Sequence, residues 1–245
     1  MKILENTQIA KETFEMILEP IEDCKKLEQI FPGQFLNIKV SDFYLRRPIS
    51  IADWNEKNIT IVYKVVGKGT EKMSKLVENR FLDVLWPLGN GYHTGDIPED
   101  SILIGGGAGV PPIYGLAKRL IREEKKIKII LGFKNREEVF WQEKFKTLAA
   151  SYLGNKLEIF TEDGSYGKKG FVTDGYKNAL YTCGCGPEPM LKAIYEKSQK
   201  GQYSFEARMG CGFGVCMGCS CETLAGNKRL CKEGPVLKQE EILWK

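Results

Sequence analysis

The chain of 245 residues has only one histidine, His93, and no apolar run near the roughly 18 residues that a membrane-spanning helix needs. Its first residues lack the apolar core of a secretory signal peptide. The net charge is only +4, and the lysines are scattered rather than gathered into a basic arm. These absences predict a cytoplasmic protein with no membrane span and no nucleic-acid partner.

Cysteine, in contrast, is plentiful. Eight cysteines occur in a chain that we expect to stay in a reducing compartment, where thiols bind metals or carry out redox chemistry more often than they form disulfides. Five of them lie between Met209 and Cys231, in a loop rich in glycine. Cys211, Cys216, Cys219 and Cys231 follow the pattern C-x4-C-x2-C plus a later cysteine, which is the ligand spacing of a plant-type [2Fe–2S] cluster.

Two other interpretations of these thiols remain open. A structural zinc site more usually has paired C-x2-C motifs or histidine ligands, and His93 is far away in sequence. Simple buried thiols are the other alternative. Cys221 lies two residues beyond Cys219, and because four ligands are already provided, we predict that Cys221 is not a ligand.

The first part of the chain, residues 1–98, has short β-rich runs separated by turns. Residues 34–40 alternate between apolar and polar side chains, which is the pattern of a half-buried strand. One short helix is expected at about 71–79. Several short strands at this spacing predict a small antiparallel β-barrel. The expected strands are 14–19, 34–40, 48–52 and 59–66.

The second part, residues 99–200, alternates strands with helices, which predicts a parallel α/β domain. A glycine-rich turn follows its first strand, where a doubly wound sheet receives the phosphates of a dinucleotide, so Gly107 and Gly109 are candidate cofactor-binding residues. A strand at 204–208 is expected to lead into the third part, residues 201–245, which holds the cysteine-rich loop. The other expected strands are 101–104, 128–133, 157–161 and 180–183; the expected helices are 111–124, 136–149, 172–178 and 187–197.

Two features of the first part could bind an anion. Arg47 lies in an extended segment before Pro48, where its guanidinium could grip a phosphate through two hydrogen bonds. Gly69 and Thr70 precede the expected short helix, whose free N–H groups favour an anion. Each feature also has an ordinary interpretation, as an exposed arginine and as a helix cap.

Taken together and in this order, the two features resemble the flavin-binding barrel of the ferredoxin-reductase family, with its R-x-[YF]-S motif and G-x-G-T loop. The resemblance implies a bound FAD whose pyrophosphate is held by Arg47 and capped by Gly69 and Thr70. It also implies two flavin-lining segments. These are Ile49 and Ser50 along the isoalloxazine, with Pro48 before them as a further cofactor-binding residue, and Val62, Tyr63 and Lys64 along the flavin or its ribityl chain.

The run C-G-P-E-P-M at 185–190 resembles the C-G-P-x-x-M signature of the same family. By that resemblance, Cys185, Gly186 and Pro187 would approach the nicotinamide of a bound NAD from the carboxyl edge of the sheet. Cys183 and Cys185 are not expected to be cluster ligands.

The whole chain, in the order flavin barrel, nicotinamide domain and cysteine-rich segment, resembles the electron-transfer subunits of NAD-dependent (class B) dihydroorotate dehydrogenases. The motifs that carry this resemblance are R-P-I-S, P-L-G-N-G, G-G-G-A-G-V-P-P, C-G-P-E-P-M and the segment from Cys211 to Val236. It implies FAD, a [2Fe–2S] cluster and NAD⁺ as electron acceptor, together with a separate FMN-containing catalytic subunit, two copies of each chain. The chain has one histidine and no plausible nucleophile–base pair, so we expect it not to oxidise dihydroorotate alone.

Two alternative functions remain. A small subunit of an NAD(P)H:ferredoxin or sulfide-type oxidoreductase would share this domain order and bind a different large subunit. A zinc-stapled nucleotide-binding module would not be an enzyme.

Overall fold

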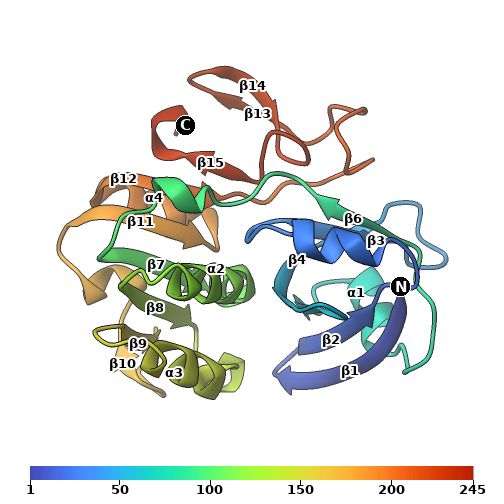
Figure 1. The fold of residues 1–245 in the computed structure, drawn as a ribbon, viewed down its shortest axis with the longest axis horizontal. Helices are drawn as coiled ribbons and strands as arrows, with labels where there is room; N and C mark the ends of the chain where they lie inside the picture. The colour runs from blue at the N-terminus through green and yellow to red at the C-terminus, as the bar shows by residue number, and fades with distance from the viewer. Residues whose placement is uncertain (245) are drawn as a thin grey trace.

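The structure is a computed structural model that describes residues 1–244. Two large sheets lie side by side, and the C-terminal segment runs across one end of both (Figure 1). The first sheet has six strands, the second has seven, and a two-stranded sheet belongs to the C-terminal segment. None of the helices in this part of the chain has both the length and the apolarity of a membrane span.

The first sheet is antiparallel and confirms the four strands that were predicted in residues 1–98. Its order is β1-β2-β5-β4-β3-β6. The apolar side chains of these strands form one core that includes Met16, Leu36 and Ile61, none of which is accessible to solvent. The strands are β1 (Lys2–Ala10), β2 (Thr13–Glu19), β3 (Phe35–Ile38), β4 (Arg47–Trp54), β5 (Ile59–Lys64) and β6 (Val84–Leu88).

The short helix of the first part differs from its prediction at 71–79. Helix α1 spans Lys68–Ser74, so it begins earlier and is shorter. The hydroxyl of Thr70 accepts hydrogen bonds from the backbone N–H groups of Val66 and Gly67, and this closes the first turn around residue 70. Gly69 and Thr70 therefore lie inside the first turn of the helix rather than before it.

The second sheet has the order β10-β9-β8-β7-β11-β12-β15, and all its strands are parallel except β15. Three helices, α2 (Val110–Arg122), α3 (Gln142–Ala150) and α4 (Glu188–Glu196), connect its strands. The strands predicted at 101–104, 128–133, 157–161 and 180–183 are confirmed. The strands are β7 (Ser101–Gly106), β8 (Ile127–Phe133), β9 (Lys156–Thr161), β10 (Lys168–Lys169), β11 (Ala179–Cys185), β12 (Ser198–Ser204) and β15 (Val236–Lys238).

Two helix predictions in the second part are wrong in extent. The predicted helix at 136–149 is broken, because a 3-10 turn (Arg136–Glu138) is followed by Phe140 and Trp141, which are buried in the core, and α3 begins only at Gln142. Trp141 has a positive φ of 57°, which a continuous helix does not allow. The predicted helix at 172–178 is a 3-10 turn at Val172–Gly175.

The strand predicted at 204–208 is also wrong. Strand β12 ends at Ser204, where it is paired with Cys185 at the end of β11. The backbone N–H of Phe205 still donates to Pro235 O, one position beyond the β12–β15 pairing, and the chain then leaves the sheet for the cysteine-rich loop. The expected division into parts 1–98, 99–200 and 201–245 stays a prediction, and β12 crosses its boundary at residue 200.

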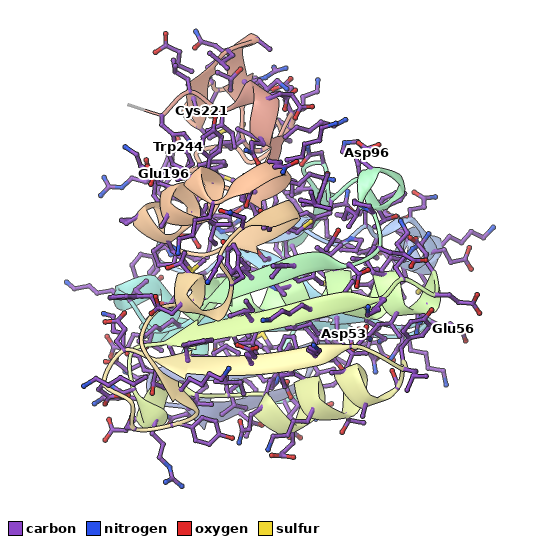
Figure 2. All side chains as sticks on the ribbon, turned by 90° about the vertical axis from the view of Figure 1, so that its left-hand side faces the viewer. Asp53, Glu56, Asp96, Glu196, Cys221 and Trp244 are labelled. Atoms are coloured by element: carbon purple, nitrogen blue, oxygen red, sulfur yellow. The ribbon has the colours of Figure 1, made fainter. Side chains whose placement is uncertain are left out.

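The C-terminal segment packs against the second sheet. A hairpin of β13 (Ser220–Thr223) and β14 (Gly226–Arg229) follows the loop, and β15 then pairs with β12. Trp244 contacts the rings of Tyr195 and Phe205 at centroid distances of 5.6 Å. Figure 2 shows Trp244 between Cys221 of the hairpin and Glu196 at the end of α4. The segment is therefore held by apolar packing as well as by strand pairing.

Candidate functional site

The four predicted ligand cysteines form two pairs in the C-terminal segment. The backbone N–H groups of Cys211 and Cys216 each donate to the sulfur of the other residue at 3.4 Å. Cys231 donates its backbone N–H to the sulfur of Cys219, also at 3.4 Å. All four are free thiols. Within residues 1–244, no three His, Cys, Asp or Glu side chains are grouped as a site for one metal ion.

The two pairs differ in electrostatic environment. Desolvation raises the pKa of Cys211, but backbone N–H groups of the loop, including that of Val215 at 3.3 Å, outweigh it and lower this pKa to about 6. Burial and the neighbouring Cys219 thiol raise the pKa of Cys231 to about 12. Metal binding must therefore displace a proton from Cys231, whereas Cys211 is largely a thiolate at neutral pH.

Glycines line the loop around the first pair. Gly212 (φ 82°) and Gly214 (φ 91°) have backbone conformations that other residues rarely adopt, and a β-carbon at Gly210 would lie 3.0 Å from the sulfur of Cys216. Two pairs of thiols, with N–H donors directed at the sulfurs, match the chemistry of a cluster in which four thiolates are shared by two irons. The residues of this segment therefore fit a [2Fe–2S] cluster.

Cys221 lies on the hairpin rather than in the loop. It is partly buried in β13, opposite Lys228 of β14. Burial raises the pKa of its thiol, which disfavours the thiolate that a metal needs. The exclusion of Cys221 from the ligands stays a prediction.

The two predicted anion-binding features of the first sheet come together. Arg47 and Gly69 are so close that a β-carbon at residue 69 would lie 2.2 Å from Arg47 Nε. The guanidinium also lies over the ring of Phe43, at 4.8 Å from its centroid. The neighbouring Arg46 is engaged elsewhere, because it donates to both carboxylate oxygens of Asp83 at 2.9 Å. Arg47 beside a glycine that leaves space for backbone approach fits the pyrophosphate of FAD.

Strand β5 faces the glycine-rich turn of the second sheet across a narrow cavity. Val62, Tyr63 and Lys64 line one side of it, and Gly107 lines the other. Tyr63 is buried, and its hydroxyl donates to Asn6 Oδ1 at 2.8 Å. Lys64 forms an ion pair at 3.1 Å with Glu138, in the 3-10 turn that follows β8. The predicted flavin strand and the predicted dinucleotide turn are therefore neighbours.

The predicted nicotinamide residues lie at the carboxyl edge of the second sheet. Cys185 ends β11 opposite Gly105 of β7, and a β-carbon at Gly109 would lie 2.0 Å from the carbonyl oxygen of Cys185. Pro187 lies 3.4 Å from the β-carbon position of Gly106. Burial raises the pKa of Cys185 to about 12, so its side chain stays a neutral thiol. The edge where parallel strands end is the place where such sheets bind dinucleotides.

Comparison with known proteins identifies the family. A model of the iron-sulfur cluster binding domain of dihydroorotate dehydrogenase B matches residues 206–243, and one of an oxidoreductase NAD-binding domain matches residues 103–196. The chain is 39% identical to the dihydroorotate dehydrogenase B (NAD(+)) electron transfer subunit of Fusobacterium nucleatum, over 97% of this chain and 95% of the relative. It is 40% identical to that of Bacillus pumilus, over 99% and 96%. The chain belongs to the family of dihydroorotate dehydrogenase B electron transfer subunits.

Solved structures agree with this membership. A chain of the NADH-dependent reduced ferredoxin-NADP oxidoreductase is 27% identical, with a TM-score of 0.83, and the match covers 99% of this chain and 89% of that chain. The cytochrome b5 reductase domain of Ulva prolifera nitrate reductase is 18% identical with a TM-score of 0.66, over 80% and 90% of the two chains. The second likeness shows the reductase fold alone.

The sequence analysis did not predict two asparagines that connect other parts of this electron transfer subunit to its C-terminal segment. Asn90 joins the first sheet to the C-terminal segment, since its amide nitrogen donates to the carbonyls of Glu233 (3.0 Å) and Val236 (2.8 Å) and its oxygen accepts from Val236 N at 3.0 Å. Asn37 of β3 donates to the carbonyl of Cys211 at 3.3 Å. A polar residue inside the apolar run F-L-N-I was the signal that could have drawn attention to Asn37.

Proposed function

We propose that this chain carries electrons between a dihydroorotate-oxidising partner subunit and NAD⁺. Membership of the dihydroorotate dehydrogenase B electron transfer subunit family supports this function. The observation that carries it is the convergence of three features in one chain. Paired thiols, a flavin-type Arg47–Gly69 contact and a glycine-rich turn facing β5 occur together in this chain.

When bound, FAD supplies the exchange between hydride and single-electron carriers, and the [2Fe–2S] cluster supplies single-electron transfer. The residues of the chain bind and orient these groups. We assign Arg47, Gly69 and Thr70 to the FAD pyrophosphate and the four paired cysteines to the irons. Lining segments complete the assignment: Pro48, Ile49, Ser50, Val62, Tyr63 and Lys64 for the flavin, and Gly107, Gly109, Cys185, Gly186 and Pro187 for NAD.

The partner surface proposed here is the outer face of the cysteine-rich loop. Phe213, Val215 and Met217 are 53%, 74% and 52% exposed, and the last two flank the exposed Cys216 in the sequence. Exposed apolar side chains that are contiguous commonly mark a protein interface. We propose that an FMN-containing catalytic subunit covers this face, with two copies of each chain in the complex and a cytoplasmic location.

The test is anaerobic reconstitution of the purified chain with FAD, iron and sulfide. We expect bound FAD, about two irons per chain, and absorption of both groups in the visible spectrum. The loaded chain should reduce an artificial dye with NADH and should not turn over dihydroorotate until the catalytic subunit is added. Turnover of dihydroorotate by the chain alone would contradict the subunit assignment. A colourless protein that holds zinc would support the nucleotide-binding module instead.

The likeness to a chain of the NADH-dependent reduced ferredoxin-NADP oxidoreductase favours one alternative, a subunit of a ferredoxin-linked enzyme. The higher identity to the dihydroorotate dehydrogenase relatives favours the first function. Co-purification with the native partner distinguishes them, because the first function requires an FMN-containing catalytic subunit and the second a larger flavin or iron–sulfur subunit.

A further inference from the structure

Arg229 and Glu233 form an ion pair on either side of the predicted ligand Cys231 in the sequence. The guanidinium donates through Nε to Glu233 Oε2 at 2.9 Å and through Nη2 to the other carboxylate oxygen, so the pair is bidentate. The backbone N–H of Arg229 also donates to Glu233 Oε2, at 2.9 Å. The two opposite charges are therefore fixed to each other next to a predicted ligand.

The remaining nitrogen of the guanidinium connects this pair to the cysteine-rich loop. Nη1 of Arg229 donates at 2.6 Å to the carbonyl oxygen of Gly214, which lies between the first two predicted ligands. In the hairpin, Arg229 is opposite Ser220, the residue directly after Cys219. Arg229 is thus adjacent to both halves of the cysteine site, the loop that carries the first pair and the strands that carry the second.

A charge in this position affects an iron–sulfur cluster because reduction makes the cluster one unit more negative. A nearby cation favours the reduced state, and a nearby anion favours the oxidised state. The side chains of Arg229 and Glu233 are 26% and 33% exposed, so water and salt screen their charges less than they screen fully exposed ones. Net charge around the cluster is one of the features that set its reduction potential.

We propose that the Arg229–Glu233 pair sets the reduction potential of the cluster through its two opposing charges. Because the guanidinium is bonded to the loop and to the carboxylate at the same time, both charges keep a fixed position relative to the cysteines. Their effects oppose each other, and neither residue is a ligand. This role rests on the proposed function, since it requires a cluster at the four cysteines, and it adds two residues that tune electron transfer.

The test is a redox titration of the full chain after reconstitution with FAD and cluster, followed by the electron paramagnetic resonance signal of the reduced cluster. Dithionite supplies the one electron that each cluster takes up, and mediator dyes equilibrate the cluster with the electrode. Arg229→Gln removes the cation, Glu233→Gln removes the anion, and the double variant removes both.

Lys228→Gln is the matched control. Lys228 is the neighbouring residue of β14, its side chain is 22% exposed, and it also forms an ion pair with a glutamate, Glu241. Side chains alternate between the two faces of a strand, so Lys228 is on the opposite face of β14 from Arg229. The control therefore removes one paired cation of similar exposure without removing the contact to Gly214.

We expect Arg229→Gln to make the cluster about tenfold harder to reduce, which is a fall of about 59 mV in a one-electron potential. Glu233→Gln should make it about tenfold easier to reduce, and the double variant and Lys228→Gln should stay within about threefold of the native chain. The proposal is overturned if the two single variants do not shift in opposite directions. It is also overturned if the double variant or Lys228→Gln shifts as far as Arg229→Gln.

Cluster content keeps the test decisive where a variant is poorly loaded. If Arg229→Gln takes up no cluster, Glu233→Gln decides: a raised potential supports the proposal, and the native potential overturns it. Loss of the cluster from both single variants would mean that the pair has only a structural role, which also overturns the proposal. A native chain that takes up no iron contradicts the proposed function instead.

Discussion

The guanidinium of Arg47 occupies the space into which a side chain at Gly69 would project, with only 2.2 Å between Nε and the β-carbon position. Alanine at residue 69 must therefore displace the end of a flexible side chain and leaves the backbone in place. Because alanine is also the better helix former, the stability of the cofactor-free chain should be equal or higher. We expect Gly69→Ala to weaken FAD binding about five- to tenfold, measured by fluorescence titration.

Gly67→Ala is the control for this prediction. A β-carbon at Gly67 has no atom within 4 Å, and the backbone there is extended, with a φ of 179°. The control should bind FAD as the native chain does. Equal losses in both variants would mean that the loop, rather than the placement of Arg47, determines the affinity.

Removal of the Arg47 guanidinium should weaken FAD binding more than its displacement by Gly69→Ala does. Charge-assisted hydrogen bonds contribute about 1.5–3 kcal/mol, so Arg47→Ala should weaken FAD binding about ten- to a hundredfold. Arg46→Ala is the matched control, because the Arg46 guanidinium is held by Asp83. FAD content after gel filtration measures both. A chain that keeps its flavin without Arg47 would refute the pyrophosphate assignment.

Substitutions can distinguish the predicted cysteine ligands from the neighbouring Cys221, which is predicted not to be a ligand. Cys216→Ser replaces a soft thiolate with a hydroxyl in the pair formed with Cys211, and we expect most of the iron to be lost. Cys221→Ser should keep about two irons per chain, because Cys221 lies in β13 beside the loop. Iron and sulfide analysis after identical reconstitution measures both. Iron loss in the Cys221 variant, with retention in the Cys216 variant, would reverse the assignment of ligands.

Short-range patterns were sufficient to predict most of the strands and the four paired cysteines. The alternation in residues 34–40 depends only on a sheet having two faces, and the cysteine spacing depends only on thiols having to reach one small centre. Both constraints act within a few residues, so they are visible in the sequence. The start of α1 was predicted too late, although the Thr70 hydroxyl that closes its first turn bonds to Val66 and Gly67, only four and three residues away.

Features that depend on packing between distant parts could not be predicted. Trp141 interrupts the predicted helix at 136–149, because its burial in the core and its hydrogen bond to Glu15 Oε2 outweigh local helix propensity. The contact between Asn37 and Cys211 joins residues 174 positions apart, and it exists only once both sheets and the C-terminal segment are assembled. Nothing within either local segment indicates the other.

Thiol reactivity should follow the pKa values of the metal-free chain. Cys211, with a pKa lowered to about 6, is mostly thiolate at pH 7 and should lose about tenfold in alkylation rate between pH 7 and pH 5, as the thiolate fraction falls. The alkylation rate of a free cysteine derivative in the same tube, with its ordinary pKa of about 8.5, should fall about a hundredfold over the same pH change. Cys185, buried and with its pKa raised to about 12, should stay unlabelled at both values. Peptide mapping by mass spectrometry measures each site. A hundredfold loss at Cys211 would mean that the loop N–H groups do not hold its sulfur in the metal-free chain.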